Sequence, residues 1–222
     1  MLVDSIDELE RIFSNPPKWF SLDTETTGLQ RDDAIVGFSF SFTEGEAYYV
    51  PISERKPTTQ KTLFKKRELS IDEVKRVLQP VLENPETTVC MHNAKFDIHV
   101  LDRHDIDVKC NVYDTMLAAW VLTNQYGNSY GLKHLAKKIL GIDMTEIKEL
   151  IGSKNMITFD KVPIDLATEY ACADADATLR LANYYREQYK GHPKLRNVLD
   201  LENKMIKVLF SMEKKGVRDI II

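Results

Sequence analysis

The segment WFSLDTETTGL (residues 19–29) constrains the fold of this chain more than any other. Its first half is apolar and aromatic, which predicts a β-strand with side chains alternating between two faces. Asp23 and Glu25 then share one face, roughly 7 Å apart along the backbone. Two like charges held that close are costly unless both bind a cation. Because Asp-x-Glu is a common pattern, a strand end with solvated acids is the alternative that this segment alone leaves open.

Further strands are predicted after this segment. Residues 34–42 alternate between two side-chain faces, and residues 47–52 form a similar run after the turn at Glu44-Gly45. Two alternating runs joined by a short turn predict an antiparallel meander. Residues 87–91, which include Val89, Cys90 and Met91, predict a buried strand. The sheet is therefore expected to mix strand directions.

Helices are predicted around the strands. Ser70 and Glu73 form the pattern of a capping box, and Pro163 is suited to the first position of a long helix. The predicted helices cover residues 4–14, 70–82, a segment that starts at 92–93, 114–122, 131–140, 163–189 and 195–215. This order predicts an α/β fold in which a mixed sheet is flanked by helices. The last helix carries an apolar stripe formed by Leu195, Leu199, Met205, Leu209 and Met212.

Composition narrows the cellular setting. The 222 residues suit one α/β domain, and the N-terminus lacks the basic start and apolar core of a signal peptide. The apolar patch at residues 116–122 is too short to span a bilayer, so no membrane association is expected. Three cysteines without a Cys-x-x-Cys pattern predict reduced thiols and a cytoplasmic protein.

The net charge of −4 does not advertise a nucleic-acid partner. Local basic patches or bound metal would have to supply the attraction. Residues 55–67 are rich in lysine and arginine. A solvated loop is the favoured interpretation of such a run, and a flap that faces phosphates is the alternative.

Four acids stand at the ends or on exposed turns of predicted elements. Asp23 and Glu25 come from the central strand, Asp97 lies one turn into a helix, and Asp174 follows Tyr170 by four residues on the long helix. Residues four apart share a helix face. Four carboxylates without a cysteine or histidine cluster predict a site for Mg²⁺ or Mn²⁺ rather than zinc.

Three segments resemble the exonuclease motifs of the DNA polymerase I family, in the order found in its proofreading domain. They are DTETTGL (23–29), NAKFD (93–97) and YACADAD (170–176). Residues 113–117 and 131–136 are similar to intervening segments of the family. The last helix resembles the start of the connection to the polymerase region. The resemblance implies an exonuclease domain over residues 1–193 and a connecting helix over 194–222.

The resemblance also implies a ribonuclease H-like fold and two-metal 3′→5′ hydrolysis of DNA, acting on single-stranded or frayed 3′ ends. By position, the two metal ions would be held by Asp23, Glu25, Asp97 and Asp174. Tyr170 would orient the attacking water, and Leu29 would press against the terminal base. The 3′ nucleotide would be contacted by Thr26, His92 and Asn93. A polymerase domain is expected in the parent protein.

Chemistry agrees with these roles. A tyrosine, with a reference pKa near 10, is poorly suited to act as a free base at neutral pH, so Tyr170 is expected to position water. His92 is expected to be structural or to contact the nucleotide. Asp176 lies about 200° around the helix from Asp174 and is expected to hydrogen-bond a neighbouring backbone or basic side chain. Residues 124–151 show no clear counterpart of the family's aromatic wedge and basic residue.

Two other functions compete with a DNA exonuclease. A ribonuclease D-like RNA exonuclease uses a similar acidic site, although the connecting helix and the context of Leu29 argue against it. A catalytically dead domain that only binds nucleic acid would be expected to lose carboxylates, and none is missing here. Motif arguments of this kind favour the active DNA exonuclease.

Overall fold

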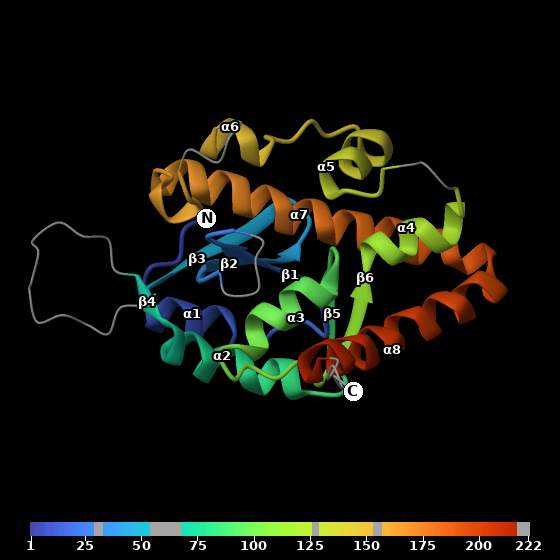
Figure 1. Ribbon diagram of the computed structural model, residues 1–222, viewed down its shortest axis with the longest axis horizontal. Helices are drawn as coiled ribbons and strands as arrows, with labels where there is room; N and C mark the ends of the chain where they lie inside the picture. Colours follow the sequence, from blue (N-terminus) through green and yellow to red (C-terminus); the bar gives the residue numbers. More distant parts are fainter. Residues whose placement is uncertain (29–32, 54–67, 126–128, 153–156, 217–222) are drawn as a thin grey trace, which may run out of the picture.

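The computed structural model describes residues 1–28, 33–53, 68–125, 129–152 and 157–216, and these are organised around a six-stranded mixed sheet (Figure 1). The strands are β1 (Trp19–Thr26), β2 (Ile35–Thr43), β3 (Glu46–Ser53), β4 (Leu69–Ser70), β5 (Thr88–Met91) and β6 (Asn111–Asp114). Their order across the sheet is β4-β3-β2-β1-β5-β6. The segment that carries Asp23 and Glu25 is therefore an interior strand.

The predicted antiparallel meander is confirmed by β1, β2 and β3, with Asp23 opposite Ser39 and Glu25 opposite Gly37. On its other side, β1 pairs with β5 in parallel, but only through residues 19–21. The second half of β1 thus has a strand neighbour on one side alone within the described residues. β4 and β6 were not predicted, because two and four residues are too few to show an alternating pattern.

Helices cover both faces of the sheet (Figure 1). One face is crossed by α7 (Ile164–Gln188), and α1 (Ile6–Ile12), α2 (Ile71–Glu83) and α3 (Ala94–Asp102) lie on the other. The remaining helices are α4 (Thr115–Thr123), α5 (Leu132–Leu135), α6 (Ile147–Ile151) and α8 (Pro193–Lys215). Three short helical segments are not α-helical: η1 (Ala136–Leu140) is a π-helix, and η2 (Phe159–Lys161) and η3 (Tyr189–Gly191) are 3₁₀-helices. The predicted mixed sheet flanked by helices is confirmed.

Alanines bring α7 close to the sheet. Ala167, Ala171 and Ala175 are buried on this helix. Small side chains allow the helix backbone to approach β1 so closely that Ser21 Oγ donates a hydrogen bond of 2.7 Å to the Ala175 carbonyl. On the opposite face, Phe20 and Leu22 are fully buried with the helices below the sheet. The close contact fixes α7, and with it Asp174, against the acidic strand.

Three sequence predictions differ in detail from the structure, and one helix was missed. The helical segment predicted over residues 131–140 runs from 132 to 140 and ends at Gly141, at a φ of 71°, but residues 136–140 have π-helical hydrogen bonding. Pro163 precedes α7 as its N-cap rather than starting it. The five-residue helix α6 was not predicted. On α8, the buried apolar residues are Leu199 and Ile206, whereas Met212, predicted to be part of the apolar stripe, is 63 % exposed.

Several predictions concern residues outside the described part of the chain. The basic run at 55–67, the turn at 152–155 beyond Gly152, and Leu29 belong to this group. Helix α8, predicted as a separate connecting segment, packs on the rest of the fold, since Leu199 and Ile206 join two of its hydrophobic clusters. None of the helices in the described ranges has both the length and the apolar composition that a membrane span requires.

Candidate active site

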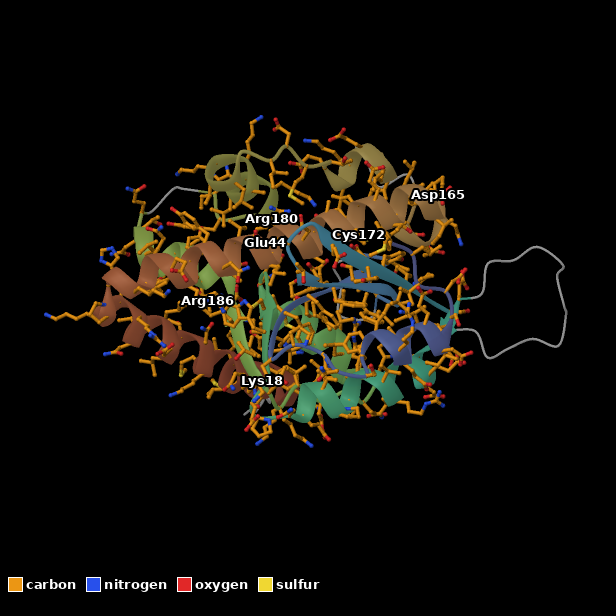
Figure 2. The ribbon with its side chains drawn as sticks, turned by 180° about the vertical axis from the view of Figure 1, so that it is seen from behind. Lys18, Glu44, Asp165, Cys172, Arg180 and Arg186 are labelled. Atoms are coloured by element: carbon orange, nitrogen blue, oxygen red, sulfur yellow. The ribbon has the colours of Figure 1, made fainter. Side chains whose placement is uncertain are left out.

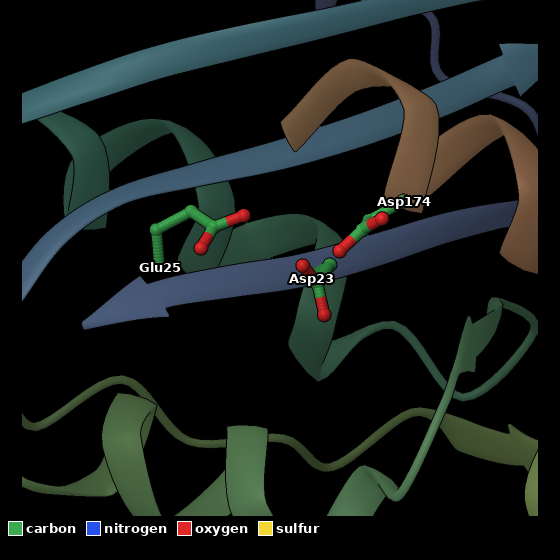
Figure 3. Close-up of side chains that lie close together, drawn as sticks. All are labelled: Asp23, Glu25 and Asp174. Carbon is green, nitrogen blue, oxygen red and sulfur yellow. The ribbon is translucent and has the colours of Figure 1, made fainter. Parts of the chain in front are cut away.

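Three carboxylates from two distant parts of the chain meet above the middle of the sheet. Asp23 and Glu25 project from one face of β1, and Asp174 reaches them from α7 (Figure 3). Each residue offers an oxygen that lies within 4.8 Å of the other two. We call Asp23, Glu25 and Asp174 the three-carboxylate group. The alternation of β1 predicted from the sequence is the reason that two of its members share a face.

The three-carboxylate group is costly to bury as it stands. Glu25 and Asp174 are only 8 % and 7 % exposed. Burial raises the pKa of Asp23 to about 6, and burial together with the charge of Asp23 raises the pKa of Glu25 well above its usual value. Glu25 Oε1 is buried without a hydrogen-bond partner among the described residues. Closely spaced carboxylate oxygens, one of them without a partner, form a donor set that fits a hard divalent cation such as Mg²⁺ or Mn²⁺.

Asp97 lies beside this group but is held differently. Its Oδ1 accepts hydrogen bonds from the Thr24 amide, at 3.0 Å, and from Thr24 Oγ1, at 2.7 Å. That amide is available because β5 pairs only with residues 19–21, so no strand covers this edge of β1 at Thr24. Burial and the charge of Asp23 raise the pKa of Asp97. The structure thus brings three of the four predicted acids within 4.8 Å and anchors the fourth to the backbone between two of them.

Tyr170 lies on the same face of α7 as Asp174, as predicted, and a lysine contacts both side chains. Lys133 Nζ forms an ion pair with Asp174 and lies 4.1 Å from the centroid of the Tyr170 ring. Burial and the negative charges of Glu25 and Asp23 raise the pKa of Tyr170. The phenol therefore keeps its proton at neutral pH, which makes it available as a hydrogen-bond donor and unsuited to act as a base.

Lys133 is a site residue that sequence reasoning missed. The sequence showed no clear basic residue for the site between residues 124 and 151, and the structure corrects this, because Lys133 comes from α5 within that range. The only signal was its place in residues 131–136, a segment similar to the family but without an assigned role. Among the described residues of the range 124–151, no counterpart of the aromatic wedge is seen at the three-carboxylate group. Residues 126–128 lie outside the described part of the chain.

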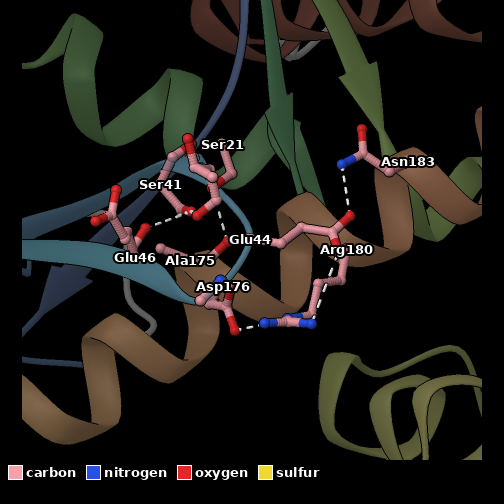
Figure 4. Close-up of polar contacts among 10 residues, drawn as sticks. Ser21, Ser41, Glu44, Glu46, Ala175, Asp176, Arg180 and Asn183 are labelled. Atoms are coloured by element: carbon pink, nitrogen blue, oxygen red, sulfur yellow. Dashed lines mark hydrogen bonds and ion pairs between the residues drawn. The ribbon is translucent and has the colours of Figure 1, made fainter.

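The opposite face of α7 is bound to the turn between β2 and β3 (Figure 4). Asp176 accepts a hydrogen bond of 2.6 Å from the Gly45 amide and one of 2.8 Å from Arg180 Nε. Arg180 also lies 3.7 Å from Glu44, seen from behind in Figure 2. The prediction that Asp176 binds a neighbouring backbone or basic side chain is confirmed. Asp176 and Asp174 therefore face different surroundings although they are two residues apart.

The residues predicted to contact nucleotide lie around the carboxyl ends of β1 and β5. Thr26 Oγ1 donates to the Gly28 carbonyl at 2.6 Å, and Asn93 is exposed at a φ of 64°. His92 Nδ1 lies 2.8 Å from Thr115 Oγ1. Burial lowers the pKa of His92 to about 4, so its ring is neutral near pH 7. Leu29 lies outside the described residues.

Comparison with known sequences covers most of the chain. The sequence profile of the 3′-5′ exonuclease family matches residues 2–190. DNA polymerase I of Pseudomonas aeruginosa is 34 % identical over 201 residues, covering 88 % of this chain and 21 % of the relative. DNA polymerase I of Chloroflexus aurantiacus is 36 % identical over 204 residues, covering 90 % of this chain and 20 % of the relative. The chain spans about a fifth of the length of these curated relatives.

Solved structures share the fold at low sequence identity. NrnC of Brucella melitensis, solved with bound Mg²⁺, superposes with a TM-score of 0.68 at 18 % identity, covering 100 % of this chain and 95 % of that one. RNase D of Escherichia coli, described as an exoribonuclease, gives 0.66 at 14 % identity, covering 96 % and 50 %. These similarities support the predicted ribonuclease H-like fold and carry no statement about substrate.

Proposed function

Because the chain belongs to the 3′-5′ exonuclease domain family of DNA polymerase I, we propose that it removes nucleotides one at a time from the 3′ ends of DNA, with two divalent cations as cofactors. The observation that carries the proposal is the three-carboxylate group, whose oxygens lie within 4.8 Å of one another. Nuclease activity follows from the family, whereas DNA as the substrate and Mg²⁺ or Mn²⁺ as the ions are proposed.

Each residue of the site is assigned a role in this reaction. Asp23, Glu25 and Asp174 would hold the cations, and Asp97, fixed by Thr24, would complete their surroundings. Bound Mg²⁺ or Mn²⁺ supplies the Lewis acidity that activates water and stabilises the departing 3′ oxygen. Tyr170 donates a hydrogen bond that orients the attacking water, because its raised pKa keeps the phenol protonated.

Substrate contacts are assigned around this centre. The 3′ nucleotide would lie against Thr26, His92 and Asn93, with Leu29 against the terminal base. His92 would contact it as a neutral imidazole, since burial lowers its pKa to about 4. Single-stranded or frayed ends are the proposed substrates. In the parent protein, residues 194–222 would lead to a polymerase domain, and the three free cysteines support a cytoplasmic location.

One experiment tests the activity and the substrate together. DNA and RNA single strands of the same sequence, labelled at the 5′ end, are incubated with Mg²⁺, with Mn²⁺ or with excess EDTA, and the products are resolved by length. We expect a ladder of DNA shortened from the 3′ end that depends on the metal. An oligonucleotide blocked at its 3′ end is the control.

Each contrary result has a distinct meaning. Faster trimming of RNA than of DNA would replace the proposed substrate and keep the reaction. Undiminished activity in EDTA, or digestion of the blocked strand, would refute metal-dependent 3′ hydrolysis. A protein that binds DNA without cutting under any of these conditions would be a non-catalytic binding domain.

A further inference from the structure

Lys133 is the one described lysine that forms an ion pair with the three-carboxylate group. It reaches from α5 across to α7, and its side chain is only 17 % exposed. Two side chains of one α7 face hold its ammonium: the Asp174 carboxylate as an ion pair and the Tyr170 ring at 4.1 Å from its centroid. A cation over an aromatic face and beside a carboxylate is stabilised by both. The Lys133 ammonium is therefore fixed at the site.

The charge of Lys133 acts on the whole three-carboxylate group. It counteracts the effect of burial on the pKa of Asp23 and of Glu25. Burial lowers the pKa of Lys133 itself to about 8, and the charges of Asp23 and Glu25 oppose that shift. Other lysines of the same region are placed differently. Lys137, four residues on, pairs with Asp143 at 2.6 Å, and both side chains are largely exposed. The buried position of Lys133 thus calls for an explanation that a surface ion pair does not need.

We propose that the Lys133 ammonium is a built-in counter-cation of the three-carboxylate group, which competes with divalent cations for Asp174 and so sets how tightly they bind. Asp174 Oδ1 is the atom that Lys133 Nζ contacts, and Asp174 is also one of the three residues that offer an oxygen to a metal ion. Positive charges a few ångströms apart repel strongly in a poorly solvated site. Lys133 must therefore give up this contact as metal ions bind, and it is then free to meet the negatively charged phosphate.

This inference rests on the proposed function, because it requires that the three-carboxylate group binds divalent cations. Its alternative is that Lys133 only packs α5 against α7. The two differ in the cation affinity of the protein: a packing residue leaves this affinity unchanged, whereas a competing charge weakens it. Affinity can be measured without any nucleic acid or turnover.

The test measures Mn²⁺ binding by titration calorimetry at a pH near 7, which lies below the pKa of about 8 of Lys133, so that its ammonium keeps its proton. Lys133→Met removes the charge and keeps the apolar stem, Lys133→Arg keeps the charge, and Lys137→Met removes a neighbouring surface charge. We expect Lys133→Met to bind Mn²⁺ about tenfold more tightly than wild type, given the size of Coulomb terms at such distances. Lys133→Arg and Lys137→Met should match wild type.

A second measurement follows thermal melting with EDTA and with Mn²⁺. We expect Lys133→Met to melt lower than wild type in EDTA, because the acids lose their counter-charge, and to gain more from Mn²⁺. If Lys133→Met fails to fold in EDTA, recovery by Mn²⁺ supports the proposal and no recovery overturns it. Lys133→Gln repeats both measurements with a side chain that retains polarity.

The outcomes separate the two hypotheses. Mn²⁺ affinity that is equal in wild type and Lys133→Met, or weaker in the variant, overturns the counter-cation. A wild-type protein that binds no Mn²⁺ and cuts no nucleic acid overturns the proposed function and this inference together. Normal metal-dependent cutting by wild type with unchanged affinity in Lys133→Met overturns the inference alone.

Discussion

The protein buries carboxylates in two regions, and the two differ in what satisfies them. At the start of α4, Asp114 accepts backbone amide hydrogen bonds from Asn93 and Ala94 of one helix start and from Met116 and Leu117 of another. In the three-carboxylate group, Glu25 Oε1 has no such donor among the described residues. Because four backbone amides of two helix starts donate to Asp114, this carboxylate has a structural role. Carboxylates that are left facing one another require a cation, which is a functional property.

Exchanging Asp174 for asparagine should break the site most severely. Asp174→Asn keeps the shape of the side chain and removes a charge that the cations need. We expect the rate of DNA cleavage to fall by roughly 10⁴-fold or more, since several kcal/mol of transition-state stabilisation depend on the metal. Cooperative thermal melting should persist. Cleavage rates and melting curves of the variant and wild type check this.

Asp176→Asn is the matched control for Asp174→Asn. It makes the same chemical change two residues away, on the face of α7 that binds Gly45 and Arg180. We expect substantial cleavage activity and a lower melting temperature. A variant at 176 that is inactive yet fully stable, combined with an active variant at 174, would reverse the two roles.

Tyr170→Phe sharpens the comparison within the site by removing only a hydroxyl group. Turnover should fall by about 10²–10⁴-fold, the usual range for a group that positions or transfers a proton. Mn²⁺ affinity should be retained, because Tyr170 lies outside the three-carboxylate group. Single-turnover rates and calorimetric titration test the two halves separately. A large loss of Mn²⁺ affinity would show that Tyr170 organises the metal ligands instead.

Asp114→Asn tests the structural region. The amide group of asparagine would turn a donor toward the Ala94 amide, which now donates to Asp114 Oδ2 at 2.8 Å. We expect the free energy of unfolding to fall by roughly 2 kcal/mol, the cost of losing a buried hydrogen bond to a charged group. Urea unfolding measures it, with Asp143→Asn, at a largely exposed ion pair, as the control. Equal stability of both variants would contradict the structural role of Asp114.

A last prediction concerns the response of stability to pH. Burial raises the pKa of Asp23 from 3.8 to about 6, so between these values the folded chain keeps a proton that the unfolded chain has lost. The contribution of Asp23 to stability is therefore fully present below about pH 4 and is lost as pH rises through about 6, where the group ionises in the folded state. Glu25 and Asp97 shift in the same direction.

Melting temperatures in EDTA across this pH range should therefore fall for wild type more than for Asp23→Asn. Mg²⁺ should reduce the fall, because a bound cation favours the ionised carboxylates. A melting temperature in EDTA that rises from pH 4 to 6 equally in both proteins would contradict the burial of Asp23 as the cause.

Much of the site is determined by local sequence. The two-residue period of a strand places Asp23 and Glu25 on one face, and the turn of a helix places Tyr170 beside Asp174 and directs Asp176 away. The capping box of Ser70 and Glu73 also forms as predicted. These features depend on backbone geometry within a few residues, and this geometry is fixed once the element forms.

Other features were decided by the tertiary structure alone. β6 forms because residues 111–114 pair with β5 in parallel. The pattern of these four residues alone does not predict that pairing. Asp97 bonds to Thr24 because β5 ends before it covers that edge of β1. Asp114 caps its own helix and also the start of α3 twenty residues earlier, and the second contact has no local sequence pattern.

Lys133 is the clearest case of the second kind. Apart from its place in the family-like segment 131–136, no local pattern assigns Lys133 a role that Lys137 and Lys138, a few residues on, would not share. Its role comes from the docking of α5 on α7, which buries one lysine against Asp174 and leaves Lys137 largely exposed. A sequence determines which charges a segment carries. Contacts between segments that are far apart in the chain decide which charged side chain is buried and which opposite charge it pairs with.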